Sequence, residues 1–305
     1  MQSAEASTGN TPAEPIGMRD RLLAFARLLM FWILCFLLFR LFLLPTCLVS
    51  EWPSDTWKWL VGGVMISLSA ITATALLSRF EKIPFARFGL GGDYRMRYAF
   101  LGVACGGTLL TLLLLALRLT TGFRFGPIYA DPLSTTGSGL LAAALAIAVA
   151  LTQETVWWGY ALVTLSVSVS FWPAAVLLGV LSGVAHYNPN AETNVGLLSA
   201  AIFEVVLAWS FRRTGSLWFA LGTHAAWHFS QQFLCGVPDI GVYLPGALFT
   251  PDIAGPEWLT GGETGPMGSI LMVPILGLLA AAIRKLPAAR EIYSLFVRPH
   301  GIIFS

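Results

Sequence analysis

The stretch GSGLLAAALAIAVALTQETVWWGYALVTLS, residues 137–166, decides the fold class of this chain. It is longer than the roughly 20 apolar residues that cross a bilayer as a helix. Its one charged residue is Glu154. An ionisable side chain in lipid costs roughly 2.5–3.5 kcal/mol on insertion scales, so such residues usually face the interior of a helix bundle and serve a function there. The segment therefore predicts a membrane helix with a functional carboxyl group, bent where Gly159 lies.

Similar apolar segments lie on both sides of this stretch, separated by prolines and glycines. They cover about 22–48, 57–78, 98–118, 171–187, 194–211, 216–235 and 267–284. The 305-residue chain is 56% hydrophobic and 11% charged, whereas soluble domains carry about 25% charged residues. We therefore predict an all-α fold, a polytopic membrane bundle of about eight transmembrane helices.

The chain divides into a tail and one membrane domain. Residues 1–21 are mostly polar and small, and we predict that they are disordered. The first apolar segment is longer than the 7–15 residues of a signal-peptide core, so we expect it to remain as a helix. The sequence has no repeat at fixed spacing, which favours a single domain over residues 22–300.

The loop charges predict the orientation of the bundle. Fourteen Lys and Arg residues fall on one side of the predicted spans and three on the other. The fourteen are Arg19, Arg21, Arg27, Arg79, Lys82, Arg87, Arg95, Arg97, Arg212, Arg213, Arg284, Lys285, Arg290 and Arg298; the three are Lys58, Arg118 and Arg124. Because cytoplasmic loops are rich in Lys and Arg, we expect a cytoplasmic N-terminus. The compact chain without organelle signals favours a bacterial inner membrane, with membrane lipids as partners. The chain has no basic run suited to nucleic acid.

Three of the four histidines lie in or at the ends of apolar segments. His186 closes one segment just before Asn188, in a polar loop that contains Pro189. His224 and His228 are four residues apart, which places them on one helical face; Gln231 extends that face, and Trp227 is expected to point elsewhere. Together with Glu154, the three histidines predict a site, although Glu154 alone fits an interhelical hydrogen bond and His186 alone fits a helix end at the interface.

Two further ionisable residues, Arg40 and Glu204, fall inside predicted spans. They could neutralise each other as an ion pair between helices. Arg40 could instead extend to the outer headgroups, which its place near that end of its helix favours. Glu204 would then be a second candidate for a polar cleft, ranked below Glu154.

Several short motifs occur in a fixed order along residues 137–235. They are Gly159-Tyr160, His186 with Asn188-Pro189-Asn190, and Thr214-Gly-Ser-Leu-Trp218 leading to His224-Ala-Ala-Trp227. In this order they resemble the CPBP family of intramembrane proteases, which includes the type II CAAX prenyl endopeptidases. The resemblance implies eight helices and a catalytic core over residues 137–235.

The resemblance also implies a mechanism. The family pattern Glu-Glu-x-x-x-Arg supplies a first Glu that activates water with a first His, which matches His186. A later His, matching His224, and an Asn four residues on hold the oxyanion. This chain departs from the pattern at four positions, where it has Gln153 for the first Glu, Trp158 for the Arg, Ser182 for a Phe and His228 for the Asn.

The departures leave three interpretations open. The first is an active endopeptidase that hydrolyses a membrane-associated or lipidated protein. In it Glu154 and His186 activate water, and His224 and His228 stabilise the oxyanion. A neutral His donates one hydrogen bond much as Asn does.

The second interpretation is a catalytically silent relative that binds and regulates a membrane protein. Gln153 favours it, because an amide cannot take a proton from water and general base catalysis contributes about 10²–10⁴-fold. Gln153, Trp158, Asn188 and Gln231 are then expected to contact the ligand, with Trp158 filling the polar cleft.

The third interpretation is a metal-dependent hydrolase. Three His and one carboxylate, from His186, His224, His228 and Glu154, form a set that zinc accepts. No cofactor is expected from the family resemblance, and a zinc ion is the alternative that these four residues allow.

Overall fold

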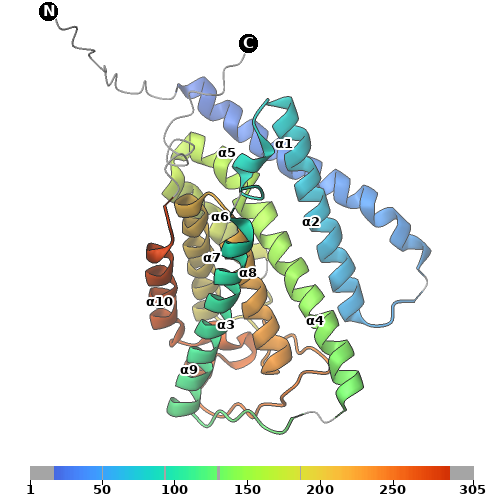
Figure 1. Ribbon diagram of the computed structural model, residues 1–305, viewed down its shortest axis with the longest axis vertical. Coiled ribbons are helices and arrows are strands. Elements are labelled where there is room, and N and C mark those ends of the chain that lie inside the picture. Colours follow the sequence, from blue (N-terminus) through green and yellow to red (C-terminus); the bar gives the residue numbers. More distant parts are fainter. Residues whose placement is uncertain (1–16, 50, 93, 129–130, 186, 289–305) are drawn as a thin grey trace, which may run out of the picture.

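The computed structural model describes residues 17–49, 51–92, 94–128, 131–185 and 187–288. These residues form helices joined by loops and contain no β-strand, so the predicted all-α membrane bundle is confirmed (Figure 1). Five segments of the described residues are long and apolar enough to cross a membrane. They are α1 (Met18–Leu43) with its following turn to Leu48, α2 (Asp55–Phe80), α3 (Arg95–Thr120), the segment Leu133–Val169, and α7 (Asn194–Thr214).

The other three predicted spans form shorter helices. They are α6 (Phe171–Ala185), α8 (Trp218–His228) and α10 (Met272–Lys285), with 15, 11 and 14 residues. α8 continues as a π-helix over Phe229–Leu234, and a short helix, α9 (Glu257–Thr260), lies in the long loop that follows. Because α8 packs against α3, α4 and α7, protein covers much of its surface and its hydropathy does not have to match a lipid-facing span.

The start of α1 corrects the predicted boundary of the tail. Residues 18–21 belong to the helix, because the chain is helical from Met18 onward. Asp20 lies in the first turn, where a negative charge interacts favourably with the helix dipole. Residues 1–16 of the predicted tail and residues 289–300 of the predicted domain lie outside the described part of the chain.

Glycines bring α3 and α8 into direct backbone contact. A Cβ atom built on Gly102 or Gly106 of α3 would collide with the backbone of Phe219 or Thr223 on α8. Gly222 of α8 makes the reciprocal approach to Ala99. Small residues four apart are the usual way for membrane helices to approach this closely. The contact fixes the position of α8, and with it the position of His224.

The long segment that carries Glu154 changes its helical geometry where the sequence predicted a bend. α4 (Pro132–Gln153) passes into a π-helix over Glu154–Trp158, and after Gly159 the chain continues as α5 (Tyr160–Val169). The Gly159 N–H donates to the Glu154 carbonyl at 3.1 Å, the five-residue spacing of a π-turn. This turn buries both Glu154 and Trp158 in the middle of the bundle.

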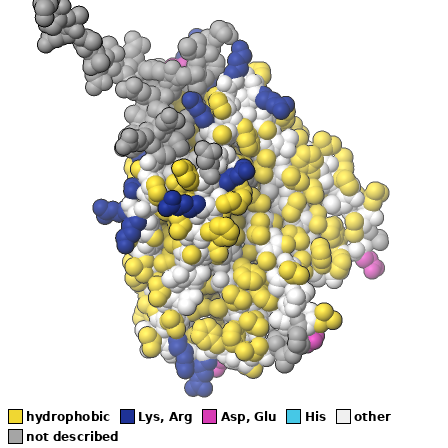
Figure 2. Space-filling view, viewed as in Figure 1, with side chains coloured by type: hydrophobic (Ala, Val, Ile, Leu, Met, Phe, Trp, Pro, Cys, Tyr) yellow, Lys and Arg dark blue, Asp and Glu magenta, His cyan; other side chains and the backbone are white. Residues whose placement is uncertain are grey.

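The two ends of the bundle differ in charge. On the face that Figure 2 shows, hydrophobic side chains predominate; most Lys and Arg lie toward the end where α1 begins and α10 ends (the basic end), and a smaller group lies at the opposite end (Figures 1 and 2). The opposite end carries the starts of α2 and α4 and the loop after α8. The long loop over residues 236–266 has four acidic residues and no Lys or Arg. This asymmetry agrees with the distribution of loop charges on which the predicted orientation rests.

Candidate active site

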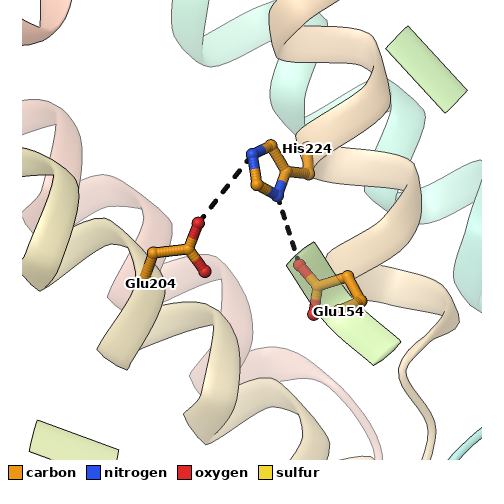
Figure 3. A group of neighbouring side chains, drawn as sticks. All are labelled: Glu154, Glu204 and His224. Atoms are coloured by element: carbon orange, nitrogen blue, oxygen red, sulfur yellow. Dashed lines mark hydrogen bonds and ion pairs between the residues drawn. The ribbon is translucent and has the colours of Figure 1, made fainter. Parts of the chain in front are cut away.

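Two carboxylates flank one imidazole in the centre of the bundle (Figure 3). Oε1 of Glu154, in the π-turn, lies 3.3 Å from Nδ1 of His224 on α8. Oε1 of Glu204, on α7, lies 3.8 Å from Nε2 of the same ring. All three side chains are buried. The arrangement holds a titratable ring between two proton acceptors, which is suited to proton transfer.

The Glu204 carboxylate is held from a second direction by Trp158. The indole Nε1–H of Trp158 donates to Oε2 of Glu204 at 2.7 Å, and the indole is fully buried. Trp158 therefore fills the protein interior and binds a carboxylate there, as the missing Arg of the family pattern could have done. The predicted alternative of an Arg40–Glu204 pair is wrong: Arg40 is exposed, and Glu204 interacts with Trp158 and His224.

His228 lies beside His224 and interacts with a third carboxylate. The two rings stack with their centroids 4.9 Å apart. Nδ1 of His228 lies 3.0 Å from Oδ2 of Asp239, and the Gln232 amide donates to the same oxygen at 3.2 Å. Since a carboxylate can only accept, Nδ1 of His228 carries its hydrogen toward Asp239.

A cavity of about 600 Å³ reaches this cluster. Glu204, His224 and His228 line it, whereas Glu154 lies behind His224 and is fully buried. Among the described residues, Oε2 of Glu154 has no hydrogen-bond partner. Of the cluster, the groups that can meet a substrate are therefore Glu204 and the two imidazoles.

Of the other predicted site residues, Gln153 and Asn188 line the cavity, and His186 lies outside the described part of the chain. Oε1 of Gln153 accepts a hydrogen bond from the Ser182 hydroxyl at 3.4 Å. The amide of Asn188 donates to the Ile240 carbonyl at 3.2 Å.

The structure orients Gln231 and Trp227 differently from the expectation. Gln231 is fully buried outside the cavity lining; its Oε1 accepts from the Trp227 indole at 2.8 Å, and its amide donates to the Pro238 carbonyl at 2.6 Å. Trp227 is part of the cavity wall. The π-helix that begins at Phe229 has more residues per turn than an α-helix, so it rotates Gln231 off the face that α-helical spacing predicts.

Two functional candidates were missed or ranked low from the sequence. Glu204 was detectable as a carboxyl group inside an apolar segment, but no family motif includes it. Asp239 could not be recognised from the sequence, because it lies in a long loop with three other acidic residues, Asp252, Glu257 and Glu263. Its proximity to His228 depends on how that loop folds back over α8.

The residues that could hold a metal differ from the predicted set. Ligand atoms of Glu154, Glu204 and His224 lie within 4.8 Å of one another, while His228 is engaged with Asp239. Two carboxylates and an imidazole are donors that zinc accepts. However, the carboxylates meet opposite nitrogens of His224, so an ion on one nitrogen would leave the other carboxylate across the ring. These three residues could bind one metal ion only if one carboxylate moved to the same nitrogen of His224 as the other.

The side chains of this cluster lie in the part of the chain that matches a known family model. Residues 135–230 match the family model described as type II CAAX prenyl endopeptidase Rce1-like. This match agrees with the resemblance to the CPBP family that the sequence motifs predict. The matched segment contains Glu154, Glu204, His224 and His228, whereas Asp239 lies beyond its end. No curated protein and no solved structure matches the chain.

Proposed function

We propose that this protein is an intramembrane endopeptidase of the CAAX prenyl protease type, which hydrolyses a peptide bond in a membrane-associated or lipidated protein. The observation that carries the proposal is the Glu154–His224–Glu204 array, because it places proton acceptors on both sides of a cavity-lining imidazole inside the matched segment. The family itself indicates a membrane protease whose substrate is membrane-associated.

Glu204 is the carboxylate best placed to act as the base. Gln153 cannot accept a proton from water, and Glu154 does not reach the cavity. Glu204 lines the cavity, the Trp158 indole donates to its Oε2, and its Oε1 lies 3.8 Å from Nε2 of His224. A water molecule beside Glu204 would pass one proton to the carboxylate while its oxygen attacks the carbonyl carbon, forming a tetrahedral oxyanion.

The rest of the reaction depends on His224, which Glu154 holds in place, and on His228, which transfers the proton. Glu154 acts as a positioning residue, since it holds Nδ1 of His224 and turns Nε2 toward the cavity side. His228 in its protonated form donates from Nε2 to the oxyanion and gives that proton to the leaving nitrogen as the C–N bond breaks. The proton on Glu204 then returns to His228, leaving a carboxylic acid and an amine. The role of His186 in water activation stays a prediction from the family pattern.

The second candidate, a catalytically silent relative, is favoured by one observation. Gln153 lines the cavity and accepts a hydrogen bond from the Ser182 hydroxyl. The position of the base in the family pattern therefore holds a neutral amide that is already hydrogen-bonded. Such a protein would keep the cavity to bind a membrane segment without cleaving it.

One assay separates these functions. The protein, purified in detergent, is incubated with a pool of prenylated peptides and transmembrane-segment peptides, beside His224→Ala and Glu204→Gln. Cleavage by the wild type that both variants lose supports the proposed peptidase. Binding of a peptide by the wild type with no cleavage contradicts it and favours the silent relative.

A further inference from the structure

Among the described residues, the loops that line the cavity all lie at one end of the bundle. Its outer lining comes from Lys58 and Trp59 at the start of α2, from Asn188 and Glu192 in the loop before α7, and from Asp239 and Thr264 in the long loop after α8. All of these segments lie at the end opposite the basic end (Figure 1). No residue of the described loop 81–92 or of the turn 212–217, both at the basic end, belongs to the lining.

The basic end is closed above the catalytic cluster. Tyr160 is fully buried there, with the rings of Phe31 and Phe88 at 4.9 and 5.1 Å. The Leu217 N–H donates to the Gly89 carbonyl at 3.0 Å, which joins the loop after α2 to the turn before α8. The Tyr160 hydroxyl donates to Glu81 at 2.6 Å and ties α5 to the end of α2. A peptide therefore has no passage to His224 from this end.

We infer that the site takes its substrate from the non-cytoplasmic side of the membrane, as the outer end of an apolar, membrane-anchored segment. The inference rests on the proposed function and names the side and class of its substrate. The basic end is cytoplasmic by the positive-inside rule, so the mouth faces outward. A lipidated tail that stays in the cytoplasm would have to cross the bundle to reach Glu204.

The walls of the cavity fit such a segment. Ile66 of α2, Leu145 and Val149 of α4, and Leu197 and Ala200 of α7 supply apolar surface between the mouth and the cluster. Residues of α2, α4, α6, α7 and α8 line the cavity; α2 packs on α4, and α6 packs on α7. An apolar chain can keep its side chains on these walls while its scissile peptide reaches the polar end.

Cysteine labelling tests the side of the mouth without requiring activity. Cys47 is exposed, and it lies in the turn between α1 and α2, at the same end as Lys58. A membrane-impermeant maleimide should label Cys47 in intact spheroplasts, and Cys47→Ser should remove that labelling. Lys82→Cys in the Cys47→Ser background, at the basic end, should be labelled only in inverted vesicles. The opposite pattern would overturn the inference.

A cavity-filling pair tests the route of the substrate. Gly62 lines the cavity near its mouth, and a Cβ atom there meets no atom within 4 Å; Gly277 on α10 has the same free space away from the cavity. In proteoliposomes of known orientation, a transmembrane-segment peptide added at the mouth side should be cleaved. Gly62→Phe should lower that rate roughly tenfold or more, and Gly277→Phe should not.

The outcomes separate the two proposals. Cleavage only of peptide added at the basic side would overturn the inferred route and leave the peptidase function intact. Cleavage from neither side, with Cys47 labelled from outside, would contradict the peptidase function and support the position of the mouth.

Discussion

Nδ1 of His228 lies 3.0 Å from Oδ2 of Asp239, although His228 ends α8 and Asp239 belongs to the long loop that follows. Within the described part of the chain, the contacts of the His228 ring to Asp239 and Gln232 involve Nδ1, and Nε2 makes no hydrogen bond. Nε2 is also not a fully buried atom. It is therefore open toward the cavity that the ring lines. The loop after α8 thus orients a group of the proposed catalytic site.

Asp239→Asn should lower kcat on the order of 10²-fold with a smaller change in KM. The amide removes the negative charge that holds the His228 ring, while substrate contacts elsewhere in the cavity remain. Asp239→Glu should restore part of kcat, and Asp252→Asn, an exposed residue of the same loop, should match the wild type. Steady-state kinetics measure all three. Equal rates for Asp239→Asn and wild type would remove this pair from the mechanism.

Glu204→Gln should lower kcat by about 10²–10⁴-fold, because the carboxylate is the proposed base. The variant should still fold, since the Gln carbonyl can accept the Trp158 indole hydrogen bond in place of the carboxylate. Thermal unfolding in detergent checks folding, and peptide cleavage checks the rate. Glu257→Gln, exposed on α9, is the matched control. Full activity in Glu204→Gln would return the base role to Glu154 or His186.

Gln153→Glu should change the cleavage rate less than about tenfold, since an active wild type already has a base. The substitution restores the first Glu of the family pattern at a cavity-lining position beside Ser182. The same peptide pool and purification conditions serve both proteins. Activity that appears only in Gln153→Glu would identify the wild type as a silent relative whose cavity survived the loss of its base.

Chelation should leave cleavage unchanged, because Glu154 and Glu204 are paired with opposite nitrogens of His224. The protein is treated with EDTA or 1,10-phenanthroline and assayed, with elemental analysis of the untreated sample. Loss of activity that added zinc restores, together with about one metal ion per chain, would favour the metal-dependent interpretation.

Glu81 should make stability depend on pH. Burial raises the pKa of the Glu81 carboxyl above the ordinary 4.5. The hydrogen bond from Tyr160 and the charge of Arg27 lower the pKa, but their effect is smaller than that of burial. The folded state therefore binds this proton more tightly than the unfolded state, and its contribution to stability falls as pH rises from about 4.5 to the raised pKa. Over that range, the melting temperature of the wild type should fall relative to that of Glu81→Gln. Parallel melting curves for the two proteins would contradict this.

Much of the proposed site followed from residue type and local spacing. Glu154 stood out as a charge in an apolar run, and His224 with His228 stood out by their helical spacing. Those patterns involve residues within one or two helical turns, so they can be recognised without knowledge of the fold. Gln231 shows the limit, because the π-helix after His228 changes the helical period on which its placement depended.

The sequence by itself determined the membrane bundle and its helical segments, because lipid admits backbone only with its hydrogen bonds satisfied and the bilayer thickness sets the length of apolar runs. The tertiary structure decided which polar groups meet. Glu154, Glu204 and His224 come from three separate segments, and Asp239 reaches His228 from a loop. Such contacts depend on close approach of helices, as at Gly102 and Gly106, and on the rotation that each π-turn introduces. The spacing of residues along the sequence alone predicts neither the close approach of the helices nor the rotation at a π-turn.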